Sequence, residues 1–330
     1  MSLPSSSGVK PAASAAAEPP DEPPAVRVVS NGLPSHMSGV MGHKPSYGIV
    51  PAHGQIPGPP GTLTLADLAV AGPMARSVDD LELALDLLTG PNRWDRAAWR
   101  LDLPPARHHH LPGLRVAAWL DDERCPVDPE VGALLAGAAD HLTAGGARVD
   151  GDARPGFSLA KAADTFMALL YAALSGGYAR DQLEGFAADT QGGPVGDGHR
   201  LSAMRHREWL SQNERRLQLR RQWEQFFEGW DVILLPVMPC TAFPHDHSEP
   251  MAARLLTYGG TEHPYWDAAT WMAPAGICYL PATVVPVGLT TGGLPVGIQI
   301  VGPYLHDRTT LAVARLLAER VGGCPRPPGC

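Results

Sequence analysis

Lysine and charge are scarce in this sequence. Only three of its 330 residues are lysines, Lys10, Lys44 and Lys161, and charged residues make up 18% of the chain. The net charge is -8 at pH 7, so the chain lacks the basic excess through which proteins bind nucleic acids. No apolar run approaches the roughly 20 residues that span a bilayer, and the first residues lack the charged and apolar regions of a secretory signal. We therefore expect a cytoplasmic protein with neither a nucleic-acid nor a membrane partner.

Cysteine is also infrequent, and its spacing argues against several kinds of site. The five cysteines are an odd number and form no Cys-x-x-Cys pair, which indicates reduced thiols. The three adjacent histidines at 108–110 lie in a Pro-flanked loop and are not expected to converge on one metal ion. The stretch at 245–247 lacks a further ligand at a recognisable spacing, so we predict a surface turn there. The sequence has no His-Glu-x-x-His, phosphate-binding-loop or Gly-x-Ser-x-Gly motif, which argues against zinc proteases, nucleotide hydrolases and α/β-hydrolases. No metal or cofactor is expected.

The chain divides into a tail and one large domain. Residues 1–26 hold two Pro-Pro pairs and no periodic apolar face, so we predict a disordered tail rich in proline, alanine and serine. The rest of the chain, 27–330, is predicted to be one domain. Hydrophobic residues make up 44% of the whole sequence, which is enough for a sizeable core. The domain begins in a stretch crowded with small residues, where one backbone segment can approach another closely.

Helices and strands alternate along this domain. Ser77 is a good N-cap, and Val78 and Leu81 begin an apolar helical face. An apolar run at 113–120, a helix capped by Asp128 and a second strand ending near residue 149 form one β-α-β unit. Further segments are predicted as helices at 157–181, 202–229 and 307–321, a buried strand at 231–236, and a hairpin at 282–302 around Thr-Thr-Gly-Gly. The pattern indicates an α/β fold with helices packed on a sheet.

Several long stretches together resemble the amidase signature family of amide hydrolases. They read GHKPSYG, AGPMARSVDDLELALDLLTGP, WDVILLPVMPCTAFPHD, and LPATVVPVGLTTGGLPVGIQIVG with the helix that follows. They keep the family's order from about residue 39 to residue 323. The resemblance implies a three-layer α/β/α fold around a mixed sheet, incomplete at its N-terminus.

The resemblance also implies a catalytic arrangement. Members of the family hydrolyse amides with a nucleophilic Ser, a second Ser on a cis peptide bond, and a Lys. The second Ser passes a proton to the neutral Lys, because a hydroxyl is a weak nucleophile without a base. Counted back from Gly42 and Lys44, the nucleophile position falls on Ser30 and the cis-Ser position on Ser6. Lys44 itself is predicted to fix its loop rather than to react.

The residues around these positions depart from the family pattern. Val28 and Val29 stand where the family keeps glycines whose N–H groups form the oxyanion hole, and Gly32 stands where it has Arg. The family's Lys lies upstream of the cis-Ser, and no lysine precedes Ser6 in this sequence. We therefore expect amide hydrolysis to be lost or strongly impaired. A shifted reading frame, a wrong start or a true pseudoenzyme would explain it, and the upstream DNA read in three frames would distinguish them.

A substrate pocket is implied just before the Leu-Pro-Ala-Thr segment. In relatives this region walls the acyl pocket, which points here to Trp266, Trp271, Met272 and Ile277, although a plain core role explains these residues equally well. The expected ligand is a small amide with an apolar part, and homo-oligomer formation is left open. Two alternatives stay open: a protein like the A subunit of the tRNA-dependent amidotransferase, and a non-catalytic protein that binds small amides or acts as a scaffold.

Overall fold

A mixed sheet forms the centre of the molecule. The computed structural model describes residues 31–53, 63–65 and 67–324, so the tail predicted at 1–26 lies outside the described residues. The strands of the main sheet are β1 (Met41–Lys44), β2 (Met74–Ala75), β3 (Arg115–Ala118), β4 (Arg148–Asp150), β5 (Val232–Pro236), β8 (Ala282–Leu289) and β9 (Pro295–Val301). They run in the order β2-β1-β8-β9-β5-β3-β4. β3 pairs in parallel with β4 and β5, and the other pairs are antiparallel.

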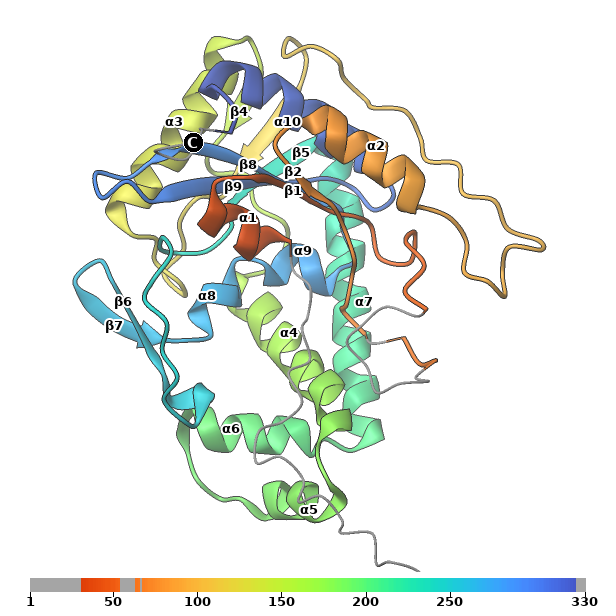
Figure 1. Cartoon of the computed structure of the whole chain (residues 1–330), viewed down its shortest axis with the longest axis vertical. Coiled ribbons are helices and arrows are strands. Elements are labelled where there is room, and N and C mark those ends of the chain that lie inside the picture. Colours follow the sequence, from red (N-terminus) through yellow and green to blue (C-terminus); the bar gives the residue numbers. More distant parts are fainter. Residues whose placement is uncertain (1–30, 54–62, 66, 325–330) are drawn as a thin grey trace, which may run out of the picture.

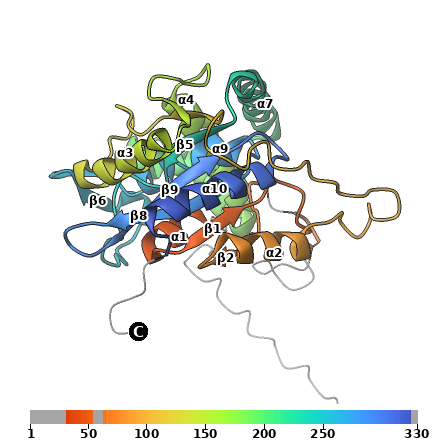
Figure 2. The ribbon, with the colours of Figure 1, turned by 90° about the horizontal axis from the view of Figure 1, so that it is seen from above.

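Helices cover both faces of this sheet and make three layers (Figures 1 and 2). One face carries α2 (Val78–Leu88), α3 (Pro129–Ala144) and α10 (Asp307–Val321), and the other carries α4 (Leu159–Leu174), α7 (His206–Gly229) and α9 (Ala273–Ile277). In β5, successive side chains alternate between the two helix layers. Val232 and Leu234 enter the first apolar cluster, while Ile233 and Leu235 enter the second, as the two-residue period of a strand requires. The predicted α/β fold is confirmed.

The remaining elements lie around the lower face in the view of Figure 1. They are α1 (Gly32–Ser38), α5 (Arg180–Ala188), α6 (Gly193–Ser202), α8 (Asp267–Thr270) and the hairpin of β6 (Leu255–Tyr258) and β7 (Thr261–Pro264), with short 3-10 turns at Ser175–Gly177 and Met251–Ala253. The helices predicted at 157–181 and 202–229 are bounded differently. The first ends at Leu174, before a Ser-Gly-Gly turn, and the second begins at His206 after the separate helix α6.

Two helix starts form as their sequences predict. The Ser77 hydroxyl accepts the N–H of Asp80 at 3.1 Å at the start of α2. At the start of α3, one oxygen of Asp128 accepts the N–H of Glu130 at 3.0 Å. The other oxygen accepts the N–H of Gly259 at 3.1 Å, so this cap also ties the β6–β7 hairpin to α3.

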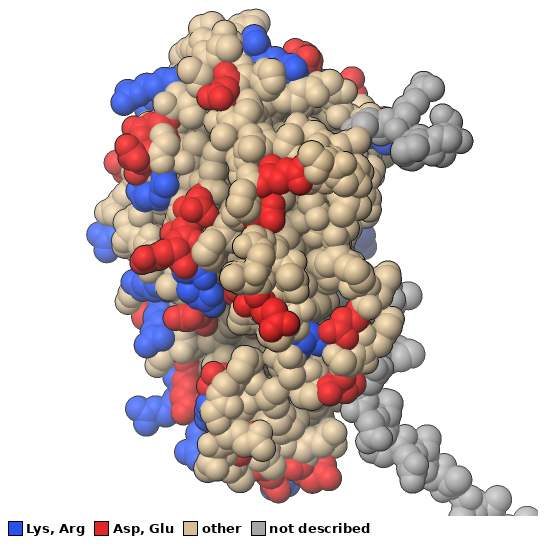
Figure 3. Space-filling model, turned by 90° about the vertical axis from the view of Figure 1, so that its left-hand side faces the viewer, with Lys and Arg blue, Asp and Glu red and all other residues tan. Residues whose placement is uncertain are grey.

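Two features of the described residues concern the membrane and nucleic-acid partners that the sequence analysis did not expect. No helix in the described ranges is both long and apolar enough to cross a membrane. On the face shown in Figure 3, acidic and basic side chains lie beside one another rather than gathering into one basic area.

The packing of α3 can be tested with one buried and one exposed leucine. Leu135 has no exposed surface, whereas the side chain of Leu87 in α2 is 77% exposed. Leu135→Ala should lower the free energy of unfolding by about 2–5 kcal/mol, because it leaves a cavity. Leu87→Ala should change it by less than about 0.5 kcal/mol. Urea unfolding followed by circular dichroism measures both, and equal losses would contradict the packing of α3 described here.

Candidate active site

The catalytic positions implied by the resemblance precede the described residues. Ser6, Val28, Val29 and Ser30 all lie outside them, so their roles stay predictions. The described chain begins at Asn31, the residue next to Ser30 in the sequence, and α1 begins one residue later. The surroundings of α1 are therefore where the structure bears on the candidate site.

α1 is held in place by a buried histidine. The side chain of His36 has no exposed surface. Its Nδ1 accepts the N–H of Gly297 in β9 at 3.0 Å, and its Nε2 lies 3.0 Å from the carbonyl oxygen of Cys240. Nδ1 also lies 3.2 Å from the carbonyl oxygen of Gly297, and a neutral ring with its proton on Nε2 satisfies the two shorter contacts. Burial lowers the pKa of His36, which is consistent with a neutral tether between β9 and the segment after β5.

Two glycines let the backbone approach α1 closely. A Cβ on Gly42 would overlap the Ser35 hydroxyl, and one on Gly72 would overlap the carbonyl oxygen of His43. That carbonyl also accepts a hydrogen bond from the Asn31 side-chain amide at 3.0 Å. The glycines at these two positions therefore serve close approach between segments.

A buried carboxylate joins β1 to α10. Asp307 accepts hydrogen bonds from the Ser46 N–H at 2.8 Å and hydroxyl at 2.7 Å, and its Oδ1 lies 3.2 Å from Nε2 of His43. Nδ1 of His43 lies 2.9 Å from the hydroxyl of Thr283, which in turn donates to Thr310 at 2.9 Å. All five side chains are fully buried. Burial would raise the pKa of Asp307, but the hydrogen bonds from His43 and Ser46 outweigh it and hold the pKa below its usual value.

The order of groups in this network argues against a serine-histidine-aspartate relay. In such a relay the histidine lies between the hydroxyl and the carboxylate. Here Asp307 lies between Ser46 and His43, so the hydroxyl donates directly to the carboxylate. The network is suited to positioning the segment after β1, not to activating Ser46.

Lys44 lies beside this network, at the end of the strand that carries His43. Its side chain is half-buried at the end of β1, and its Nζ donates to the carbonyl oxygen of Pro45 at 3.0 Å. Burial lowers the pKa of Lys44 to about 8, and the negative charge of Asp307 opposes the shift. That Lys44 fixes its loop stays a prediction.

Sequence patterns did not single out a cluster of arginine and tyrosine side chains beside this loop. One guanidinium nitrogen of Arg216 lies 2.9 and 2.8 Å from the two oxygens of Asp67, and the Tyr279 hydroxyl donates to Asp67 at 2.9 Å. The Tyr279 ring stacks on Tyr47 at 4.2 Å. Tyr279 has φ 68°, a left-handed conformation that no propensity rule anticipates for tyrosine. Arg220 also lies over the Tyr279 ring, with 5.2 Å between the guanidinium carbon and the ring centroid.

The four residues expected to wall a substrate pocket are spread over different surroundings. Trp271 and Ile277 have no exposed surface and belong to the apolar cluster beneath the sheet. The indole N–H of Trp271 donates to the carbonyl of Cys125 at 3.1 Å. Trp266 and Met272 are partly buried at the edge of that cluster. Their pocket role stays a prediction.

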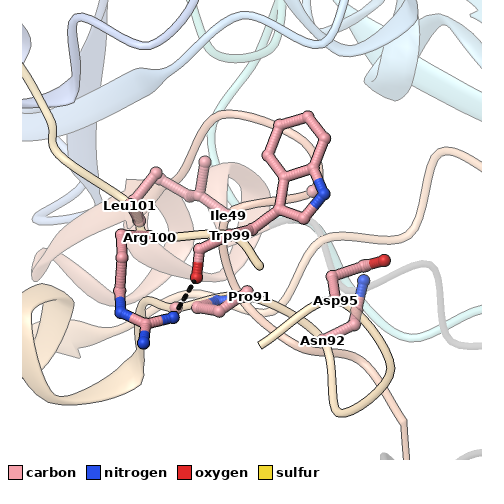
Figure 4. Close-up of a pocket in the computed structure, with 9 residues that line it drawn as sticks. Ile49, Pro91, Asn92, Asp95, Trp99, Arg100 and Leu101 are labelled. Carbon is pink, nitrogen blue, oxygen red and sulfur yellow. Dashed lines mark hydrogen bonds between the residues drawn. The ribbon is translucent and has the colours of Figure 1, made fainter. Parts of the chain in front are cut away.

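The described residues do contain a pocket elsewhere, between the segment after β1 and the loop after α2 (Figure 4). Its volume is about 260 Å³. The lining residues are Gly48, Ile49, Gly90, Pro91, Asn92, Asp95, Trp99, Arg100 and Leu101. Within the described ranges, no group of three or more histidine, cysteine, aspartate or glutamate side chains is placed to hold a metal ion.

The sequence of this chain matches that of a known protein family. The sequence profile of the amidase family matches residues 30–311. The chain belongs to the amidase family. Its match begins at Ser30 and includes the segment after β1, the β8–β9 hairpin and the start of α10.

Individual relatives are identical to this amidase-family chain at about a quarter of the aligned positions. It is 28% identical over 307 residues to the A subunit of glutamyl-tRNA(Gln) amidotransferase from Synechococcus sp. (strain WH7803), covering 85% of this chain and 60% of the relative. It is 26% identical over 291 residues to indoleacetamide hydrolase of Bradyrhizobium japonicum, covering 88% and 60%. The chain thus spans about 60% of the length of these relatives.

Solved structures show the same fold at lower identity. The A subunit of glutamyl-tRNA(Gln) amidotransferase from Thermotoga maritima superposes with a TM-score of 0.67 at 20% identity, covering 89% of this chain and 62% of that one. A bacterial aryl acylamidase of the amidase signature family gives 0.66 at 20% identity, covering 87% and 59%. The three-layer arrangement expected from the sequence is confirmed.

The Asp307 network can be tested against a surface ion pair on the same helix layer. Asp307→Ala leaves buried donors of Ser46 and His43 without an acceptor, which costs on the order of 1–3 kcal/mol for each group. Asp86→Ala removes only the partner of Arg308 at a surface ion pair, where the change should stay below about 1 kcal/mol. Chemical unfolding of both variants measures the difference. A loss for Asp307→Ala no larger than that for Asp86→Ala would contradict a stabilising network.

The pKa of Lys44 predicts a stability change at alkaline pH. The folded chain releases the Lys44 proton near pH 8, whereas an unfolded lysine keeps it until its ordinary value of 10.5. The unfolded state therefore binds more protons in this window, and wild-type stability should rise with pH relative to Lys44→Met. Urea unfolding at pH 7, 8.5 and 10 gives the difference. Exposed Lys161→Met is the control, and a constant difference for Lys44→Met would refute the shift.

Proposed function

We propose that the chain is an amide hydrolase of reduced activity, with Ser30 at the position of the acyl nucleophile. The observation that carries the proposal is the family match from Ser30 to residue 311, together with the anchoring of the helix that follows Ser30. In this reaction the Ser30 oxygen attacks the amide carbonyl, the C–N bond breaks as nitrogen takes a proton, and water then hydrolyses the acyl-enzyme. Ser6 would be the proton relay.

Reduced turnover follows from residues beside the nucleophile. A backbone oxyanion hole requires N–H groups that converge on one point. Val28 and Val29 are the two residues that precede Ser30. Their β-branched side chains favour an extended backbone over a tight turn. Gly32 stands where the family carries Arg. These substitutions favour slow chemistry even where the scaffold around α1 is preserved.

The proposed substrate is a small carboxylic amide with an apolar acyl or aryl part. The similarity to indoleacetamide hydrolase supports this class, as does the apolar character of Trp266, Trp271, Met272 and Ile277. We further propose that the protein works in the cytoplasm, where the free thiols of Cys125, Cys240 and Cys278 would stay reduced. Association into a homo-oligomer remains part of this proposal.

A second candidate is a component of an amidotransferase. Its support is the similarity to the A subunit of the Synechococcus enzyme over 85% of the chain. Such a protein would act with other polypeptides, so affinity purification from the source cell should recover them in fixed proportion. A chain that binds small amides without turnover would instead fit the non-catalytic alternative.

The hydrolase proposal is tested with a panel of simple amides that includes indoleacetamide. The purified chain should hydrolyse one or more of them slowly, and Ser30→Ala should abolish that turnover. Ser38→Ala, at an exposed position at the end of α1, should leave it unchanged. Turnover that survives Ser30→Ala would rule out Ser30 as the nucleophile.

The proposed cause of slow turnover has its own test. Val28→Gly combined with Val29→Gly should raise kcat by roughly tenfold or more, because a single oxyanion-hole donor contributes on the order of 10²–10³ in rate. The same pair of substitutions in the Ser30→Ala background should have no effect. If the double substitution leaves kcat unchanged in the protein that keeps Ser30, the two valines do not limit the reaction.

A further inference from the structure

We propose that Arg220, which lies beside the rings of both Tyr279 and Tyr304, binds the carboxylate of a small aromatic acid. The site lies where α7 meets the segment after β1, the loop before β8 and the loop before α10. Binding there requires no hydrolysis, so this proposal and the proposed function can fail independently.

The positive charge of Arg220 has no partner in the described chain. Its guanidinium carbon lies 5.2 Å from the centroid of the Tyr279 ring and 4.8 Å from that of the Tyr304 ring. Within residues 31–53, 63–65 and 67–324, none of its N–H groups donates a hydrogen bond and no carboxylate pairs with it, although the residue is partly buried. Contact with two aromatic rings orients the planar guanidinium, whose adjacent N–H groups match the two oxygens of a carboxylate.

Arg216, one helical turn earlier in α7, is compensated by the fold itself. Its guanidinium carbon lies 4.7 Å from the centroid of the Tyr279 ring, and its N–H groups donate to Asp67 and Asn213. The same ring therefore contacts two guanidinium groups, and the carboxylate of Asp67 pairs with only one of them. This leaves the charge of Arg220 available to a ligand.

Backbone strain gathers at this cluster. Leu68, Tyr279 and Leu305 are the three non-glycine residues of the described chain with positive φ, at 66°, 68° and 66°. Leu68 directly follows Asp67, whose carboxylate accepts the Tyr279 hydroxyl. Leu305 directly follows Tyr304. Bulky residues rarely take this conformation, and those that do concentrate at active sites and ligand clamps. Their convergence around one unpaired guanidinium indicates a binding site.

The three tyrosines of the cluster are tied to one another. The Tyr304 hydroxyl donates to the carbonyl of Tyr47 at 3.0 Å, and the N–H of Tyr47 donates to the carbonyl of Tyr279 at 3.1 Å. All three residues are partly exposed, so aromatic surface lies beside the guanidinium. Aromatic rings contact one another favourably in offset-stacked or edge-on arrangements. An acid with an aromatic part matches this surface, and the tied tyrosines lower the entropy cost of binding it.

The charges around the site favour a monoanion. Burial raises the pKa of the Tyr304 hydroxyl, the positive charge of Arg220 lowers it, and the negative charge of Asp307 raises it. Burial likewise raises the pKa of Tyr279, and the negative charge of Asp67 adds to the rise. Both tyrosines beside Arg220 therefore lie in the field of a carboxylate, which repels a dianion such as phosphate more strongly than a monoanion.

Four compounds separate the requirements of the site. Isothermal titration of the full chain with benzoate should give saturable binding. Benzyl alcohol keeps the ring without the charge and should bind roughly tenfold more weakly, because a hydrogen bond to a charged group is stronger than one to a neutral group. Cyclohexanecarboxylate keeps the charge without the aromatic ring and should also bind more weakly. Tighter binding of inorganic phosphate than of benzoate would overturn the carboxylate, and no saturable binding of benzoate would overturn the site.

Matched variants assign benzoate binding to Arg220. Arg220→Gln should weaken benzoate binding by roughly tenfold. Arg221→Gln, at the exposed position next to it on α7, should leave the affinity unchanged. If Arg220→Gln lowers the melting temperature, Arg220→Lys decides the matter. It keeps the charge without the planar fork, so its affinity for benzoate should lie between those of the wild type and Arg220→Gln. Wild-type affinity in Arg220→Gln would place benzoate elsewhere and overturn the proposal.

Discussion

The buried carboxylate of Asp307 is the interaction on which the candidate site most depends. A charge without exposed surface is costly unless several donors satisfy it, and here the donors come from Ser46 and His43, more than 260 residues earlier in the chain. The first turn of α10 and the segment after β1 must therefore fold together. Lys44 and Tyr47 lie on that same segment, so their positions are decided by a contact with the C-terminal helix.

α1 extends this dependence toward the predicted nucleophile. A helix of seven residues gains little stability from its own hydrogen bonds. His36 compensates by bridging β9 and the segment after β5, and Asn31 bonds to the carbonyl of His43. The residue that follows Ser30 is thus located by tertiary contacts with β1, β9 and the chain beyond β5.

The two charged regions near this scaffold differ in how fully their charges are compensated. Arg216 is buried, and its guanidinium donates hydrogen bonds to Asp67 and Asn213, so its positive charge is compensated inside the fold. In the loop after α2, Asp95 and Arg100 retain groups without partners in the described chain. The guanidinium of Arg216 is buried and needs these partners, whereas Asp95 and Arg100 are exposed and their remaining polar groups face water.

The sequence by itself determined the local elements. Ser77 and Asp128 mark the starts of α2 and α3, and Thr-Thr-Gly-Gly marks the β8–β9 turn, because caps and turns act over a few residues. Only the tertiary structure decided that His43 meets Asp307, that Trp271 is fully buried, and that Asp95 and Arg100 flank one pocket. The first two depend on which strands become neighbours, since β1 pairs with β8 and β5 with β9 across long stretches of sequence. Periodicity records which face of an element is apolar but not which distant element will cover it.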